Sequence, residues 1–171
     1  MNITIIHPRM HAIGGAERLV TDLAVELSLR GHVIRLITGK CHSYWKSLLT
    51  RNDRISVKEL GIRADSPIFW LFMKKFCYRL AKLADKSSQL LIASGFPSTI
   101  SAAIAPCKNA IKLAYLHDAP PAIHDVEAWR KLPTHLRIFY TVMAKRYGEI
   151  DKHSLLYSCL LYTSPSPRDR G

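Results

Sequence analysis

Residues 6–38 read IHPRMHAIGGAERLVTDLAVELSLRGHVIRLIT, and their pattern decides the fold of the chain. A β-branched run ends at Ile6, a glycine-bearing loop follows, and apolar residues take helical spacing from Ala16 onward. Gly31 can adopt the positive φ that often ends a helix, and a second apolar run covers residues 33–37. The stripe expected to face the sheet consists of Leu19, Leu23 and Leu27, with Val20 and Ala24 beside it. Two parallel strands joined by a helix form a right-handed βαβ unit.

The rest of the sequence repeats this alternation of strands and helices. Further strands are predicted over residues 55–60, 89–94 and 110–116. Helices are predicted over residues 43–51, 67–86, 98–105 and 125–152. We therefore expect an α/β fold with a Rossmann-like parallel sheet and helices on both of its faces.

The loop before the first helix is one candidate site. Gly14 and Gly15 lack the Cβ atoms that would keep a phosphate away from the backbone N–H groups at the helix N-terminus. A Gly-Gly pair before a helix can equally be no more than a tight turn. The loop has neither the G-x-G-x-x-G spacing of a dinucleotide-binding protein nor the Gly-Lys-Ser/Thr ending of a P-loop.

A second candidate site follows the strand predicted over residues 110–116, which delivers His117 and Asp118 to its carboxyl end. Ligands of open α/β sheets bind in the crevice at the carboxyl ends of the strands. Two prolines shortly afterwards stiffen the chain, so both side chains would be held in place. A capped turn with a surface histidine is the alternative. In a parallel sheet this loop and the Gly14–Gly15 loop would lie at the same edge.

The composition describes a folded domain with an unusual charge. A chain of 171 residues has the length of one ordinary domain, and 48% hydrophobic with 22% charged residues is typical of globular proteins. The 25 Lys and Arg residues exceed the 13 Asp and Glu residues, which gives a formal net charge of +12. An excess of this size favours anionic partners, such as nucleotides, phospholipid surfaces or nucleic acid, without choosing among them.

Cysteine spacing and the amino terminus indicate a reducing compartment and no metal. The four cysteines are Cys41, Cys77, Cys107 and Cys159, with no C-x-x-C pair, and no histidine pair has metal-binding spacing. The amino terminus starts directly in a predicted strand, and no run approaches the roughly 20 apolar residues of a spanning helix. We therefore expect a cytoplasmic protein that can act peripherally at the inner face of a membrane.

The helix predicted over residues 67–86 combines aromatic and basic side chains. It is apolar on every side over nearly two turns and basic beyond them. Packing on the sheet explains the apolar turns, whereas contact with anionic lipid would use the basic residues as well. The candidate membrane-surface residues are Trp70, Lys74, Lys75 and Arg79.

The opening unit resembles the start of glycosyltransferase family 4, whose members are retaining sugar transferases with the GT-B fold. Such proteins begin with a strand, a GG-x-E loop, a helix ending in A-x-x-L-x-x-R-G-H and a second strand. The matching residues are Gly14, Gly15, Glu17, Leu27, Arg30, Gly31 and His32. Residues 115–120, YLHDAP, resemble the Y-x-H-x-x-P segment of the mannosyltransferase-like members. The resemblance is specific over about 30 residues and continues more weakly to Ser158.

The resemblance implies a hexosyltransferase that moves a sugar from a nucleotide-sugar donor to a glycan or lipid-linked acceptor with retention, without an obligatory metal or other cofactor. Gly14, Gly15 and Glu17 would bind the donor. His117 would be the catalytic residue beside the transferred sugar, and Asp118 would support its loop. Arg137, Lys145 and Arg146 would contact the acceptor or a lipid phosphate. Nucleic acid is not an expected partner.

The resemblance also implies a domain organisation. Residues 1–158 would be the amino-terminal, acceptor-side domain, which is one half of a GT-B architecture. Residues 159–171, with their Ser-Pro-Ser-Pro-Arg run, break the pattern and are set aside as a non-native-looking or disordered tail. The Glu-x7-Glu segment of the nucleotide-sugar domain has no match, so we expect this chain to be inactive alone.

Two other classes of function compete with this hypothesis. A Rossmann-type oxidoreductase would need a G-x-G-x-x-G loop and an acidic residue after the second strand, where this sequence has Thr38-Gly39-Lys40. A non-catalytic basic module that binds anionic membranes is the alternative that the charge supports.

Overall fold

The computed structural model describes residues 1–64, 67–116, 133–156 and 160–163. Its centre is a six-stranded sheet in the order β5-β3-β1-β6-β7-β8, in which every pair of neighbours is parallel. The strands are β1 (Asn2–Ile6), β3 (Val33–Thr38), β5 (Ile55–Glu59), β6 (Leu90–Ser94), β7 (Ile111–Leu116) and β8 (Leu160–Thr163). Two short strands, β2 (Arg9–Met10) and β4 (Lys40–Cys41), form a separate parallel pair.

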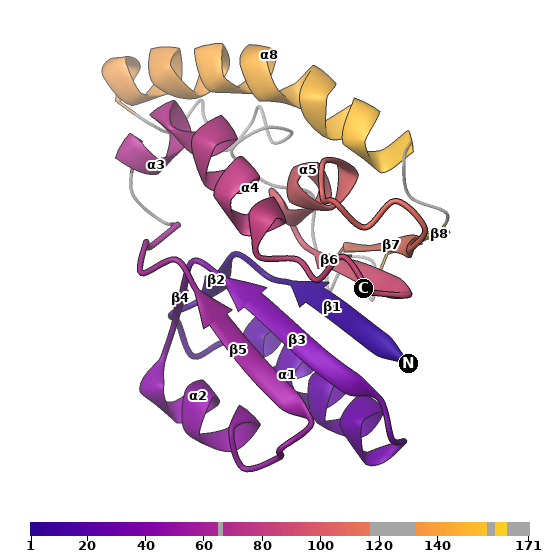
Figure 1. Cartoon of the computed structure of the whole chain (residues 1–171). Coiled ribbons are helices and arrows are strands. Elements are labelled where there is room, and N and C mark those ends of the chain that lie inside the picture. Colours follow the sequence, from indigo (N-terminus) through magenta and orange to yellow (C-terminus); the bar gives the residue numbers. More distant parts are fainter. Residues whose placement is uncertain (65–66, 117–132, 157–159, 164–171) are drawn as a thin grey trace, which may run out of the picture.

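Helices cover both faces of the sheet, which confirms the expected Rossmann-like α/β class (Figure 1). One face carries α1 (Gly15–Leu29) and α2 (Ser43–Leu49), and we call it the α1 face. The opposite face carries α3 (Pro67–Leu71), α4 (Met73–Lys82), α5 (Ser98–Ala103) and α8 (Thr134–Leu156), and we call it the α4 face.

The central strands are buried on both sides, as alternating side chains of a covered parallel sheet must be. In β1, Ile3 and Ile5 pack into the α1 face, whereas Ile6 packs into the α4 face. Thr4 is also buried, and its hydroxyl lies 2.6 Å from the hydroxyl of Ser88. The polar group is therefore satisfied inside the sheet.

The inward stripe of α1 differs from the prediction. Leu19 is 39% exposed, and the helix buries Val20 and Ala24 together with polar residues. The hydroxyl of Thr21 donates to the Glu17 carbonyl oxygen at 2.8 Å, which removes the cost of burying that hydroxyl. The buried stripe is therefore rotated toward the polar residues, and the leucines pack at its margin or face outward.

Two predicted helices have different bounds in the structure. The single helix predicted over residues 67–86 is wrong, because the chain forms α3 and α4 with Phe72 between them at φ −107° and ψ 12°. The helix predicted from residue 125 is observed as α8 from Thr134 to Leu156, and residues 125–132 lie outside the described part of the chain. Gly31 has φ 88°, as predicted for the end of the first helix.

The structure describes four residues of the tail that was set aside at residues 159–171. Residues 160–163 form β8, which pairs with β7 in parallel register from Leu113↔Leu160 to Leu116↔Thr163. Residues 164–171 lie outside the described part of the chain. The domain boundary at residue 158 stays a prediction.

Candidate functional site

The two loops expected to form a site leave the same edge of the sheet. The strands β1, β6 and β7 are neighbours and run in parallel, and their registers Ile6↔Ala93 and Ala93↔Ala114 place the three carboxyl ends together. The chain enters the Gly14–Gly15 region after β1 and leaves β7 at Leu116. His117 and Asp118 lie outside the described residues, so their roles stay predictions.

His7 is the first residue after β1, and its side chain and backbone contact both neighbouring strands, β6 and β3. The side chain is buried, and its Nδ1 lies 3.1 Å from both the carbonyl oxygen and the hydroxyl of Ser94 at the end of β6. Its backbone N–H donates to the carbonyl oxygen of Ile37 in β3 at 3.0 Å. One residue thereby connects the ends of three adjacent strands.

Glu17 is turned toward His7 and is buried beside the loop. The side chain is buried, and its Oε1 lies 3.9 Å from His7 Nε2. Burial would raise the pKa of Glu17, but its interactions with the His7 ring and with its own backbone N–H outweigh burial and keep the pKa below its usual value. The carboxylate is therefore ionised at neutral pH and places a negative charge at the helix N-terminus, where the dipole stabilises it.

Gly14 and Gly15 form the exposed head of α1. Gly14 is the N-cap residue in an extended conformation without a side-chain cap, and its carbonyl oxygen accepts the N–H of Arg18 at 3.1 Å. A Cβ at Gly14 would lie 2.6 Å from Glu17 Oε2, whereas a Cβ at Gly15 would have nothing within 4 Å. The first-turn N–H groups of a helix have no intrahelical partner. Gly15 is exposed and the space in the direction of its missing Cβ is open, whereas the Glu17 carboxylate lies beside Gly14.

This geometry separates the roles of the three residues predicted to bind the donor. Gly14 and Gly15 are exposed at a helix N-terminus, which is the setting in which backbone groups bind phosphate. Glu17 is turned inward toward His7 and supports the loop from beneath. The Glu17 carboxylate therefore lies at the same helix end as the exposed glycines, next to the Cβ position of Gly14 and away from that of Gly15.

The basic residues predicted to contact the acceptor lie on another face of the sheet. Arg137, Lys145 and Arg146 are exposed on α8, which packs against α5 on the α4 face. The guanidinium of Arg146 lies over the ring of Tyr147 at 5.6 Å from its centroid. The carboxyl edge and these three cations are thus carried by different elements, and nothing in the described residues joins them to the Gly14–Gly15 loop.

The predicted membrane-surface residues differ in how exposed they are. Lys74, Lys75 and Arg79 are exposed on α4. Trp70 is half-buried instead, because its ring stacks on Phe96 with centroids 5.9 Å apart. Trp70 is therefore part of the packing of the α4 face, and membrane contact by it and by the three cations stays a prediction. Among the described residues, no helix is both long enough and apolar enough to cross a membrane.

Three residues of interest were missed from sequence: His7, Ser94 and Phe72. A polar residue between the β-branched run and Pro8 was the available signal for His7, since such a position falls at a strand end. Ser94 carried no comparable signal, because its contact with His7 spans 87 positions of sequence. Phe72 was hidden in an apolar run, and its exposure follows from the break between α3 and α4.

The three cysteines that the structure describes are free thiols. Cys41, Cys77 and Cys107 are buried and unbridged. Burial, followed by the nearby charge of Glu59, raises the pKa of Cys41 to about 11, and burial raises that of Cys77 to about 12. Within the described ranges, no three His, Cys, Asp or Glu residues are grouped closely enough to hold a metal ion.

The fold and this loop define an α/β protein with an open helix N-terminus at the carboxyl edge of a parallel sheet. Over 41 residues the chain is 49% identical to alpha-1,3/1,6-mannosyltransferase ALG2 of Eremothecium gossypii. The match covers 24% of this chain and 8% of that protein. Neither a protein-family model nor a solved structure matches the chain. The partial similarity supports the glycosyltransferase class that the sequence predicted.

Proposed function

We propose that this chain is the amino-terminal, acceptor-side domain of a retaining glycosyltransferase of family 4 with the GT-B fold. The observation that carries the proposal is the exposed Gly14–Gly15 head of α1 at the carboxyl edge of a parallel sheet. The 41-residue similarity to a mannosyltransferase supports the same class of activity.

The proposed reaction moves a hexose from a nucleotide-sugar to a glycan or lipid-linked acceptor. Departure of the nucleotide leaves charge on its diphosphate, and backbone N–H groups fixed at a helix N-terminus stabilise such charge. Gly14 and Gly15 would supply these groups, because neither carries a side chain on the open side. The contact between Glu17 and His7 would help to keep this loop in place during the reaction.

The remaining site residues have proposed roles that follow from the family resemblance. His117 would contact the transferred sugar and Asp118 would support its loop. Arg137, Lys145 and Arg146 would bind the acceptor or its lipid phosphate. Nucleotide and sugar would be selected by a second domain, so we expect no transfer by the 171-residue chain alone.

A non-catalytic module that binds anionic membranes is the second candidate. The exposed cations of α4 and the net charge of +12 favour it. The two functions are distinguished by whether the carboxyl edge of the sheet is needed. Membrane binding would survive substitutions at Gly15 and His117, whereas sugar transfer would not.

A domain exchange tests the glycosyltransferase proposal. Residues 1–158 would replace the corresponding amino-terminal domain of the Eremothecium gossypii mannosyltransferase, and transfer of labelled mannose to its acceptor would be measured. We expect transfer by the chimera, a loss of about 100-fold in kcat with His117→Ala, and no transfer by the isolated chain. A chimera that is folded by circular dichroism but inactive would contradict the proposal, as would transfer that His117→Ala leaves unchanged.

A further inference from the structure

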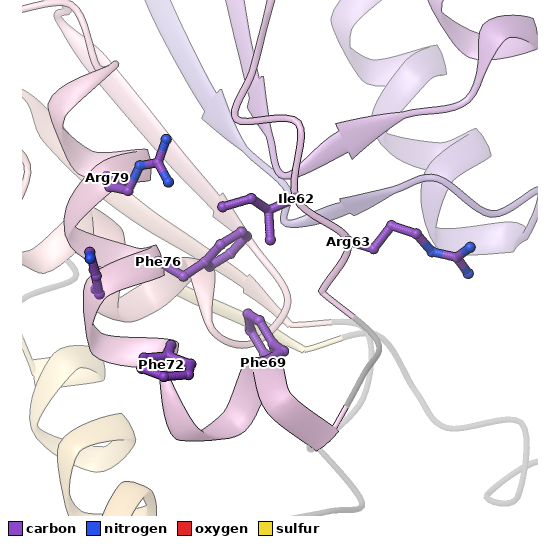
Figure 2. A pocket seen from close by; sticks show the side chains of 7 residues that line it. Ile62, Arg63, Phe69, Phe72, Phe76 and Arg79 are labelled. Carbon is purple, nitrogen blue, oxygen red and sulfur yellow. The ribbon is translucent and has the colours of Figure 1, made fainter.

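A cavity of about 280 Å³ opens between the loop after β5 and the helices α3 and α4. Its apolar lining consists of Ile62, Phe69, Phe72 and Phe76. In Figure 2 the side chains of Ile62, Phe69 and Phe76 converge on the same space. The rings of Phe69 and Phe76 meet edge to face at 4.9 Å, and both are almost fully buried. These two rings form a fixed floor, and their packing does not depend on a ligand.

The rim of the cavity is open and partly apolar. Phe72 is 61% exposed at the break between the two helices, and Leu71 beside it is also exposed. Two adjacent large apolar side chains in solvent cost free energy unless another apolar phase covers them. Because Leu71 and Phe72 lie at the mouth of a cavity lined by phenylalanines, an apolar ligand that covers them could also enter the cavity.

The same rim is positively charged. Lys75 and Arg79 line the cavity one helical turn apart, and Lys74 and Lys82 are exposed on the same helix. The helix contains no acidic residue, and within the described ranges no carboxylate lies within ion-pair distance of Lys75 or Arg79. Like charges one turn apart on a helix repel each other, so an anion between them would be stabilising.

The chemistry of the lining excludes most small polar ligands. The seven lining residues supply no hydroxyl, amide or carboxylate side chain. A sugar or a nucleobase needs such groups for orientation, and burying it without them would leave its polar atoms unsatisfied. Arg63 also lines the cavity, but its side chain extends away from the phenylalanine rings in Figure 2. An apolar chain that ends in an anionic group satisfies both halves of the lining.

We propose that this cavity binds one anionic phospholipid of a membrane surface. Its phosphate would lie between Lys75 and Arg79, and part of one acyl chain would enter between Phe69, Phe72 and Phe76. Leu71 and Phe72 would insert at the headgroup boundary, as the apolar face of an interfacial helix does. The site does not depend on sugar transfer, since lipid binding can be measured without donor or acceptor.

Soluble short-chain lipids test the site with the full chain. Binding of dihexanoyl phosphatidylglycerol below its micelle concentration would be followed by calorimetry, beside dihexanoyl phosphatidylcholine and glycerol phosphate. We expect the anionic lipid to bind at least tenfold more tightly than either comparison ligand. If glycerol phosphate binds as tightly as the anionic lipid, the cavity binds the phosphate and not the acyl chain. Equal binding of phosphatidylcholine would show apolar binding without charge recognition, and either result would overturn the proposal.

Variants separate this cavity from the general positive charge of the chain. The double variant Lys75→Gln/Arg79→Gln should weaken binding of the anionic lipid by at least about tenfold, since the phosphate would lose both charged hydrogen-bond donors. Arg51→Gln/Lys58→Gln is the matched control, because it removes two exposed charges from the turn after α2 and from β5, away from the cavity lining. Phe72→Ser keeps every charge and should weaken lipid binding about tenfold, with glycerol phosphate unaffected.

The outcomes are unambiguous when circular dichroism shows all variants to be folded. Equal losses in the two double variants would mean that net charge and not the cavity binds lipid. An unchanged lipid affinity of Phe72→Ser would contradict the proposed binding of an acyl chain in the cavity. Absence of lipid binding by the unaltered chain would overturn it outright and leave an acidic protein segment as the occupant to examine.

Discussion

The two faces of the sheet are built in different ways. On the α1 face, aliphatic side chains from consecutive βαβ units pack together, and buried polar groups bond within their own helix, as Thr21 does to Glu17. On the α4 face, aromatic side chains far apart in sequence hold the layer: Trp70 stacks on Phe96, and the Tyr147 hydroxyl donates to the Trp70 carbonyl oxygen at 2.9 Å. The first face follows from local pattern, and the second depends on tertiary contact.

Truncating the aromatic centre should produce the largest loss of stability. Trp70→Ala removes the stacking on Phe96 and the edge contact with Tyr140, and we expect the free energy of unfolding to fall by about 4 kcal/mol. Val20→Ala on the α1 face, at a fully buried position, should cost about 2 kcal/mol. Urea unfolding of both variants measures the difference. A larger loss for Val20→Ala would reverse the comparison.

This contrast explains how much of the fold could be predicted. The strands of the sheet up to residue 116 and the helices α1 and α2 were located within a few residues, because β-branched runs and amphipathic spacing mark them. The break at Phe72 was not, since no glycine or proline marks it and the packing of Trp70 places it. β2 and β4 are too short for any periodicity to appear.

The candidate site shows the same division. Gly14 and Gly15 could be located from sequence, because a glycine pair before a helix is a local pattern. The inward orientation of Glu17 could not, since it depends on His7 across the β1–α1 loop. The exposure of Phe72 likewise depends on how two helices end against their neighbours and not on its own sequence context.

Substitution of Gly39, which lies between β3 and β4, should cause the next largest loss of stability. A Cβ at Gly39 would lie 2.9 Å from the Pro8 carbonyl oxygen and even closer to that of Ile62. Both neighbours are backbone atoms and cannot move aside as a flexible side chain does. We expect Gly39→Ala to cost about 2 kcal/mol. Gly15→Ala, where a Cβ meets nothing, is the control and should leave the unfolding midpoint nearly unchanged.

The His7–Glu17 pair makes stability depend on pH. The pKa of Glu17 is lowered from 4.5 in the folded protein, so its contribution is complete above that value and is lost as the pH falls through the folded-state pKa. Glu17→Gln should cost about 1 kcal/mol at pH 7, and the difference from the unaltered chain should shrink under acid. Glu26→Gln, at an exposed i,i+4 pair with Arg30, should show almost no effect at either pH. A pH-independent loss for Glu17→Gln would contradict the ionic account.

The smallest expected difference between the two faces is in the rate at which their buried thiols are labelled. Cys41 on the α1 face has a pKa of about 11, and Cys77 on the α4 face has a pKa of about 12. Because the thiolate is the reactive form and Cys77 is the more deeply buried thiol, iodoacetamide at pH 8 should modify Cys41 faster than Cys77 in the folded chain. Peptide mapping by mass spectrometry measures each rate, and labelling in denaturant is the control. Faster modification of Cys77 would show that the α4 face opens more readily.

We propose that the exposed N-terminus of α1 receives the diphosphate of a sugar donor. Gly15→Val tests it most directly, since a Cβ at Gly15 would have no protein atom within 4 Å and the valine methyl groups would add bulk on the side proposed for the phosphate. Leu29→Val, at an exposed position of the same helix, is the matched control. In the active chimera we predict unchanged folding for both variants and a loss of about 100-fold in sugar transfer for Gly15→Val alone. Equal transfer by the two variants would contradict the account.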